Sequence, residues 1–151
     1  MPNCITNKLT ILGTEEQIKE VMDFIKIEKT DENQEPFGLG TIDFNKITPM
    51  PKWVYGSNPK VQGISSKDKE KYGEENTSLE WSRRNWGTKW NAFSQPDKRN
   101  TYNTIYFETA WNGVPVLISK IAWMFLDVVI EYSYTDEDFG NDVARYKFKD
   151  T

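Results

Sequence analysis

The chain has 151 residues, the usual size of one domain, and its hydrophobic share of 37% and aromatic share of 14% allow a core built largely from rings. This composition excludes a disordered chain and a collagen. The single cysteine, Cys4, excludes an intramolecular disulfide and a cysteine-cluster metal site, and it fits a reducing cytosol. The net charge is −4 and histidine is absent from the sequence, which removes the commonest general base and most zinc sites.

The first part of the chain predicts a strand followed by a helix. Apolar residues alternate over residues 5–11, a pattern typical of a half-buried strand, although Asn7 interrupts the apolar side. Residues 14–17 read Thr-Glu-Glu-Gln, a capping box in which the threonine hydroxyl and the glutamine side chain each bond a free backbone N–H. This box opens an amphipathic helix over about residues 15–27, where apolar side chains recur at helical spacing.

The middle of the chain is polar and less regular. Residues 42–45 alternate in a short predicted strand, which the prolines that follow it end, because proline donates no ladder hydrogen bond. We expect a surface insertion at about residues 52–80, with a short helix around residues 67–72. A second capping box at residues 77–80 opens a helix of about two turns, and Gly87 beyond it suits a backbone position with positive φ.

The second half of the chain predicts a hairpin, a helix and two further strands. Apolar and polar residues alternate over residues 86–93 and again over residues 101–111, and a short polar turn joins these two strands into a hairpin. Pro115 opens a second amphipathic helix that extends to Phe125, since the first helical position needs no N–H. The last two predicted strands cover residues 128–134 and 144–148.

This order of elements predicts a ferredoxin-like split βαβ fold of the α+β class. We expect one antiparallel sheet with the two main helices on one face, plus an inserted short helix and extra strands. The strand that begins at Trp86 and the last strand are the additions to the basic plan. Residues 1–151 then form a single ferredoxin-like domain with its surface insertion at about residues 52–80.

Several short stretches resemble a known family. Residues 85–92 read Asn-Trp-Gly-Thr-Lys-Trp-Asn-Ala, and residues 107–111 read Phe-Glu-Thr-Ala-Trp, with Pro115 following. The opening Met-Pro-Asn and the Ile-Asp-Phe-Asn of residues 42–45 add to the similarity. Together these stretches resemble the YubB-type ferredoxin-like family, small proteins carried by phages and conjugative plasmids.

The resemblance covers nearly the whole chain and implies a ferredoxin-like fold and a mobile-element origin. The chain departs from the family opening, since Cys4 stands where a tryptophan is usual and Ile5 where the cysteine is usual. The resemblance implies no catalytic residue. It implies no iron–sulfur cluster either, because a single cysteine cannot hold one.

The candidate binding residues are aromatic and polar side chains in and after the Trp-Gly-Thr-Lys-Trp-Asn-Ala stretch: Trp86, Lys89, Trp90, Asn91 and Trp111. A buried indole N–H or amide must find a hydrogen-bond partner, so these residue types are costly to place without a role. In the architectural interpretation the tryptophans fill the interface between sheet and helices, with Trp90 and Trp111 in the core. In the functional interpretation Lys89 and Asn91 contact a ligand in a pocket.

An open sheet face offers a second candidate surface. It would carry tyrosines and scattered basic side chains, namely Tyr102, Tyr106, Tyr132 or Tyr134, Lys89 and Arg145. Aromatic side chains on an open sheet stack the bases of single-stranded nucleic acids in RRM-type folds. No segment has the aromatic RNA-binding pattern of those folds, however, and the acidic net charge without a basic stripe predicts no binding of duplex DNA.

These patterns predict a non-enzymatic accessory binding protein of a phage, plasmid or prophage, which acts in the bacterial cytoplasm through contact with an unknown protein partner. Single-stranded nucleic-acid binding through the open sheet face is the first alternative. An enzyme on a small polar substrate is the second, with Glu108 as a general base that no motif pairs with another group. We expect no cofactor and no metal ion. We also expect no membrane span, because no apolar run approaches the ~18 residues that a span needs.

Overall fold

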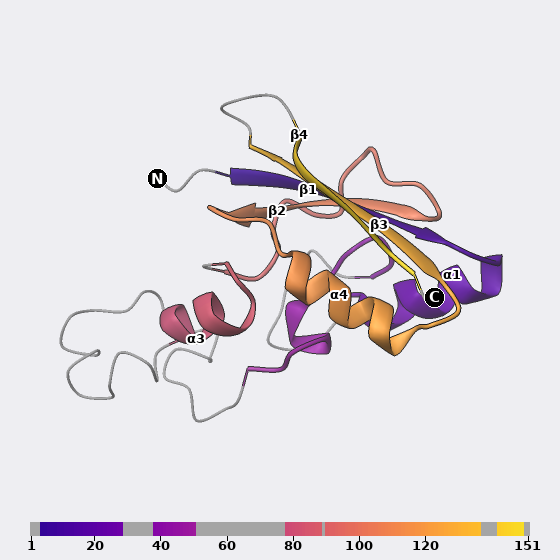
Figure 1. Cartoon of the computed structure of the whole chain (residues 1–151), viewed down its shortest axis with the longest axis horizontal. Coiled ribbons are helices and arrows are strands. Elements are labelled where there is room, and N and C mark those ends of the chain that lie inside the picture. Colours follow the sequence, from indigo (N-terminus) through magenta and orange to yellow (C-terminus); the bar gives the residue numbers. More distant parts are fainter. Residues whose placement is uncertain (1–3, 29–37, 51–77, 89, 137–141, 150–151) are drawn as a thin grey trace.

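Four antiparallel strands form one sheet, and the two main helices lie together on one of its faces (Figure 1). The computed structural model describes residues 4–28, 38–50, 78–88, 90–136 and 142–149. Its elements are β1 (Cys4–Leu12), α1 (Glu15–Ile25), the 3-10 helix η1 (Phe44–Lys46), α3 (Ser78–Asn85), β2 (Thr104–Ala110), α4 (Pro115–Met124), β3 (Val129–Asp136) and β4 (Asp142–Phe148). The strands lie in the order β2-β1-β3-β4, and neighbouring strands are antiparallel. This arrangement confirms the predicted α+β, ferredoxin-like plan.

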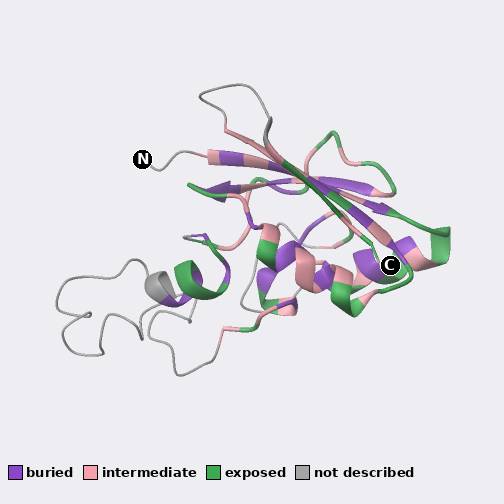
Figure 2. Cartoon of the chain, viewed as in Figure 1, coloured by how far each residue is buried: buried purple, intermediate pink, exposed green. Residues whose placement is uncertain are grey.

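The core lies between the sheet and the two helices, where Figure 2 shows the buried residues. Strand β1 alternates as predicted, so that Ile5, Leu9 and Ile11 are buried. The buried side chains of α1 recur at helical spacing: Ile18, Val21, Met22 and Ile25. The predicted capping box is confirmed, because Gln17 N donates to Thr14 Oγ1 at 3.2 Å and Thr14 N donates to Gln17 Oε1 at 2.9 Å. Local sequence therefore sets where α1 begins and which side it buries.

The interruption at Asn7 is a buried polar link between three elements. The Nδ2 of Asn7 donates to Thr109 Oγ1 at 3.0 Å and to Phe107 O at 3.3 Å. The Tyr132 hydroxyl donates to Asn7 Oδ1 and accepts from Val114 N at 2.7 Å, one residue before α4 begins. The buried amide has its bonds satisfied, and the hydroxyl fixes the start of α4 against the sheet.

The second main helix, α4, starts at Pro115 as predicted and buries Leu117, Ile118 and Ile121 against the sheet. Gly113 lies just before it and has no room for a side chain. A Cβ atom at Gly113 would lie 2.3 Å from the ring of Tyr134. The close approach of backbone and ring lets the chain turn from β2 into α4.

The additions to the basic plan are only partly as predicted. The short helix α3 is confirmed, and Gly87 after it has a φ of +81°, a value that favours glycine. The last strand is confirmed as β4, which extends the sheet beyond β3. Residues 51–77 lie outside the described residues, and with them most of the predicted insertion and the helix expected around residues 67–72.

The strand predicted over residues 42–45 is wrong, because the chain turns into η1 at Phe44. Ile42 and Phe44 are both buried. The side chain of Gln95 replaces a neighbouring strand: Ile42 N donates to its Oε1, and its Nε2 donates to Ile42 O, each at 2.9 Å. An amide side chain from a distant loop thus satisfies backbone groups that a sheet ladder would otherwise have to satisfy.

The strand predicted over residues 86–93 is also wrong, and with it the hairpin. The backbone N–H groups of Trp86 and Gly87 donate to Ser82 O at 2.8 and 3.1 Å, so the segment begins as the end of α3. Of its described residues, only Phe93 pairs with the sheet, in an isolated antiparallel bridge to Glu108. Contacts with α3 and η1, rather than with a second strand, decide the path of this segment.

Candidate functional site

Trp86 anchors α3 to the segment around η1. It is 5% exposed, and its Nε1 donates to Thr48 O at 2.9 Å. Its ring meets Trp81 and Phe44 edge-on, with ring centroids 5.3 and 5.7 Å apart. The indole is buried, and its N–H has a backbone partner, so the architectural interpretation describes this residue.

Asn91 has a similar architectural role. Its Oδ1 accepts from Phe44 N at 3.0 Å and from Ala92 N at 2.9 Å, and its Nδ2 donates to Asp43 Oδ1 at 2.8 Å. The amide group thereby holds the start of η1 in place. Lys89, the predicted cationic partner of Asn91 at a ligand, lies outside the described residues.

Trp90 and Trp111 lie outside the core, contrary to the architectural prediction, with 46% and 42% of their surface exposed. Trp90 meets Phe93 edge-on at a centroid distance of 6.3 Å. The guanidinium of Arg83 lies 5.7 Å from the ring of Trp111, whose backbone has a φ of +71°. The candidate residues therefore divide into two groups: Trp86 and Asn91 secure the fold, whereas Trp90 and Trp111 are partly exposed at the surface.

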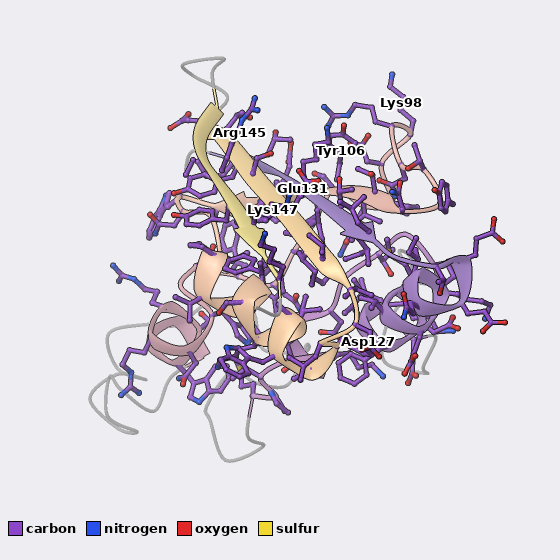
Figure 3. All side chains as sticks on the ribbon, turned by 45° about the vertical axis from the view of Figure 1, so that its right-hand side comes forward. Lys98, Tyr106, Asp127, Glu131, Arg145 and Lys147 are labelled. Carbon is purple, nitrogen blue, oxygen red and sulfur yellow. The ribbon has the colours of Figure 1, made fainter. Side chains whose placement is uncertain are left out.

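The sheet face opposite the helices carries polar side chains in rows across the strands. One row contains Tyr106, Lys8, Ser133 and Arg145, and the next contains Thr104, Thr10, Glu131 and Lys147. Figure 3 shows Tyr106, Glu131, Arg145 and Lys147 on the strands that form these rows. A hollow of ≈ 310 Å³ lies between Lys8 and Arg145 and includes Glu131 in its wall. Charges of both signs in one hollow suit the mixed charges of a polypeptide better than a run of phosphates.

Most of the tyrosines predicted for the open face are not on it. Tyr132 is buried on the helix side of β3, and Tyr134, two residues further along the strand, points the same way. Burial raises the pKa of the Tyr132 hydroxyl above its ordinary value. Tyr102 is 72% exposed but lies in the loop before β2. Of the predicted tyrosines, Tyr106 alone lies on this face, so the prediction of an aromatic stacking platform is wrong for the others.

Two cations lie against the Tyr106 ring. The guanidinium of Arg99 is 4.3 Å from the ring centroid, and Lys8 Nζ is 5.9 Å from it. Asp97 orients the guanidinium, because Arg99 Nε and Nη2 donate to its two carboxylate oxygens at 2.9 Å each. These bonds from Arg99 lower the pKa of the Asp97 carboxyl to about 2. The ring surface that a nucleic-acid base would need is thus in contact with protein cations.

The outer surface of α4 is apolar, a feature that the helical pattern did not single out. Trp123 is 78% exposed and Val116 is 69% exposed, and their spacing of seven residues places them on the same side of the helix. Met124 and Leu126 are also exposed at the end of α4. We call these four residues the α4 surface: Val116, Trp123, Met124 and Leu126. The sequence does indicate this apolar outer surface, since Lys120 is the only charged residue of this ten-residue helix and an ordinary surface helix has charged residues along its outer side.

A second hollow, of ≈ 620 Å³, lies between α1 and the loop before β2. Ile18, Met22 and Ile105 line its floor, and the exposed side chains of Leu39 and Tyr102 stand at its wall. Its walls also include carboxylate and ammonium groups of α1 and the loop. Apolar and charged side chains thus line this hollow together.

In the part of the chain that the structure describes, no three metal-ligating side chains of the His, Cys, Asp or Glu type come together. Within the same residues, no helix is both long enough and apolar enough to span a bilayer.

One comparison with known families gives a match. Residues 85–151 match the family model described as the ferredoxin-like domain in Api92-like protein. The match begins at the last residue of α3 and includes β2, α4, β3 and β4. It agrees with the ferredoxin-like fold. Comparison with curated proteins and with solved structures gives no match.

Proposed function

We propose that the chain is an accessory binding protein that acts through contact between the α4 surface and another protein. The observation that carries this proposal is the exposure of large apolar side chains along the outside of a helix whose inside is already packed on the sheet. A helix that is apolar on both sides is normally buried on both. Large apolar side chains exposed on one side of a helix mark interaction sites.

The composition of the α4 surface supports a protein partner. Tryptophan and methionine are enriched at protein interfaces, and a central tryptophan often contributes a large share of the binding energy. Polar groups stand beside it: Lys120 Nζ donates to Thr48 Oγ1 at 3.0 Å, and the exposed Asp127 follows α4 (Figure 3). Apolar side chains with polar groups among and beside them are usual in such an interface.

We further propose a mobile-element origin and action in the bacterial cytoplasm. The resemblance of residues 85–92 and 107–111 to the YubB-type family supports the origin. The presence of a single cysteine in this sequence, the half-buried Cys4, supports a reducing compartment.

Affinity capture with matched variants tests the role of the α4 surface. Tagged wild-type protein, Trp123→Ser and Tyr102→Ser are each incubated with a lysate of the host, and the protein that wild type retains is identified and purified. Tyr102 is the matched control, because it is an aromatic residue of similar exposure away from α4. Calorimetry with the purified partner should show Kd weakened by about tenfold or more for Trp123→Ser, since interface hot spots contribute about 2 kcal/mol or more.

The control should bind like wild type, and both variants should melt like wild type because each side chain is mostly outside the core. A partner that binds Trp123→Ser as tightly as wild type would overturn the proposal, as would the failure of wild type to retain any partner. If wild type sediments as a dimer that Trp123→Ser dissociates, the occupant of the surface is a second copy instead.

Single-stranded nucleic-acid binding is a second candidate, in which a base would stack on the Arg99 guanidinium and not on the Tyr106 ring that the guanidinium covers. A base can stack on an arginine plane as it does on an aromatic ring. Titration of fluorescent oligo(dT) should then show affinity that Arg99→Gln and Tyr106→Ala reduce. Equal weak binding by all three proteins would leave contact with a protein as the proposed function.

A further inference from the structure

The two edges of the sheet differ in how their backbone groups are satisfied. At the β2 edge Glu108 exchanges backbone hydrogen bonds with Phe93 at 2.9 and 3.0 Å, and Tyr106 N donates to Asn100 Oδ1 at 2.8 Å. The outward carbonyls of Thr104 and Ala110 accept from Thr101 N at 2.9 Å and from Thr88 Oγ1 at 2.7 Å. The loop that precedes β2 therefore closes this edge to any further strand.

At the other edge, the sheet ends with β4 within the described residues. Ile11 N of β1 donates to Asn103 O on the β2 side at 2.8 Å, so the odd-numbered residues of β1 bond towards β2 and the even-numbered ones towards β3. The same alternation carried across β3 directs the backbone groups of Tyr146 and Phe148 towards β3. Lys147 lies between these two residues in β4, so its backbone N–H and C=O groups point away from the sheet.

The two faces of β4 differ in chemistry. On the helix side the rings of Tyr146 and Phe148 stack at 6.0 Å with an interplanar angle of 2°, and Tyr146 stacks on Tyr132 at 6.1 Å. On the open side Arg145 and Lys147 are exposed, as Figure 3 shows. A strand added beside β4 would place alternate side chains against these two faces.

The residue opposite Lys147 within the sheet shows which charge this face accepts. Glu131 of β3 is the register partner of Lys147, an acidic side chain directly across from a basic one. Opposite charges across neighbouring strands stabilise a sheet, and like charges destabilise it. An incoming strand is therefore favoured when it carries Asp or Glu on the open side and apolar side chains on the aromatic side.

A second copy of the chain does not have this chemistry. A two-fold axis at Tyr146 would place Arg145 directly opposite the second copy's Lys147. An axis at Arg145 or at Lys147 would place that residue opposite itself. Each of these three registers brings basic side chains together, so the charges of the edge oppose self-pairing in them.

We infer that β4 is a docking edge, which accepts an extended segment of another protein as a fifth strand with alternating acidic and apolar side chains. Backbone hydrogen bonds to the edge supply affinity, and the basic and aromatic faces of β4 supply specificity. This inference goes beyond the proposed function, because it uses a different surface from α4 and specifies an extended partner.

Binding of synthetic peptides to the whole 151-residue chain tests the inference. The probe is a fluorescein-labelled Thr-Glu-Val-Glu-Val-Glu-Val-Thr, measured by anisotropy. One control peptide has the same composition in blocks, Thr-Glu-Glu-Glu-Val-Val-Val-Thr, and a second has lysine in place of each glutamate. The alternating acidic peptide should bind about tenfold or more tightly than either control, because only it matches both period and charge.

Three variants identify the edge as the binding site. Lys147→Pro removes the outward N–H and should weaken binding about tenfold beyond its matched control Lys147→Ala, with similar melting temperatures, since that N–H is not used within the sheet. The double variant Arg145→Glu/Lys147→Glu should prefer the lysine peptide. Trp123→Ser should bind the acidic peptide like wild type, so this test is independent of the α4 surface.

Equal binding of the three peptides by wild type would overturn the inference. So would equal affinities of Lys147→Pro and Lys147→Ala, since the edge N–H would then have no part in binding. Sedimentation of wild type as a dimer that Lys147→Pro dissociates would show that a second copy occupies the edge instead.

Discussion

The hydroxyl group of Tyr132 shows how a single buried atom positions a helix. It accepts from Val114 N at 2.7 Å immediately before α4 and donates to Asn7 Oδ1 in β1. Tyr132→Phe keeps the ring but leaves both partners buried without a bond, which costs on the order of 1–3 kcal/mol. We expect urea unfolding to show this loss in the free energy of unfolding at an unchanged m value.

The matched control for this change is Tyr106→Phe, on the open face of the sheet. Its side chain is only partly buried, so the free energy of unfolding should stay within ~0.5 kcal/mol of wild type. If Tyr132→Phe were as stable as this control, the hydroxyl would have no role in placing α4.

The Asp97 carboxyl shows how a neighbouring cation shifts a titration. The hydrogen bonds from Arg99 lower the pKa of its carboxyl from 3.8 to about 2. Between these two pH values the unfolded chain binds more protons at this group than the folded one, so the stabilisation is present above pH 3.8 and is lost as the pH falls through about 2. The exposure of the pair keeps the energetic effect small.

NMR titration of the Asp97 carboxyl carbon measures this shift directly. Wild type should titrate near pH 2, and Arg99→Gln should move the titration up towards 3.8. A midpoint that the Arg99 substitution leaves unchanged would show that the ion pair does not hold Asp97 in solution.

At the scale of elements, one tryptophan joins α3 to η1. The Trp86 ring fills the space between Trp81 and Phe44, and its N–H bonds to Thr48 O at 2.9 Å. Trp86→Ala should therefore cost on the order of 3–5 kcal/mol, the range for a buried aromatic replaced by alanine. Thermal melting should show a large decrease in Tm, together with a less helical far-UV spectrum if α3 detaches.

Trp90→Ala is the matched comparison, because the two residues lie in the same segment and differ in burial. With 46% of its surface exposed against 5% for Trp86, Trp90 should cost less to truncate, on the order of half as much. Equal losses for the two variants would mean that the segment from Trp86 to Phe93 folds as one cooperative block.

Two further segments show why element type is not always local. Residues 42–45 have the alternation of a strand, and both of their apolar side chains are buried, yet Phe44 begins a helical turn. The side chains of Gln95 and Asn91 accept hydrogen bonds from backbone N–H groups of this segment, which would otherwise bond to a neighbouring strand. Side-chain hydrogen bonds between distant parts of the chain compete here with sheet formation.

At the scale of the whole molecule, the charge balance sets what the protein can bind. The net charge is −4, and the open sheet face carries acidic as well as basic side chains. Since phosphate neutralisation supplies most non-specific affinity for DNA, we expect no tight binding to duplex DNA. A gel shift with random duplex in ~0.15 M salt should show no complex at submicromolar protein.

A complex that forms under these conditions and weakens steeply with added salt would contradict this expectation. It would point to a basic surface formed by side chains on the open face, and Lys8→Ala and Lys147→Ala would then reduce the affinity. Unchanged affinity in those variants would place the contact elsewhere on the molecule.

Local patterns in the sequence predict the helices α1, α3 and α4 and the strands β1, β2, β3 and β4, and the order of these elements predicts that α1 and α4 share one face of the sheet. These follow from local information, because helical and strand periodicity, capping boxes and a proline at the first helical position act within a few residues. The burial of Trp86 agrees with the architectural interpretation, in which the tryptophans pack between the sheet and the helices.

The remaining features depend on the tertiary structure. It placed Trp90 and Trp111 at the surface, Tyr132 and Tyr134 on the helix side, and the segment after α3 beside η1 instead of in the sheet. It also left Trp123 exposed on α4 and the β4 edge without a neighbouring strand in the described chain. Each of these features depends on which distant side chain or strand packs against a given residue or bonds to its backbone. An alternating pattern defines the two faces of a strand, but it does not define what covers each face.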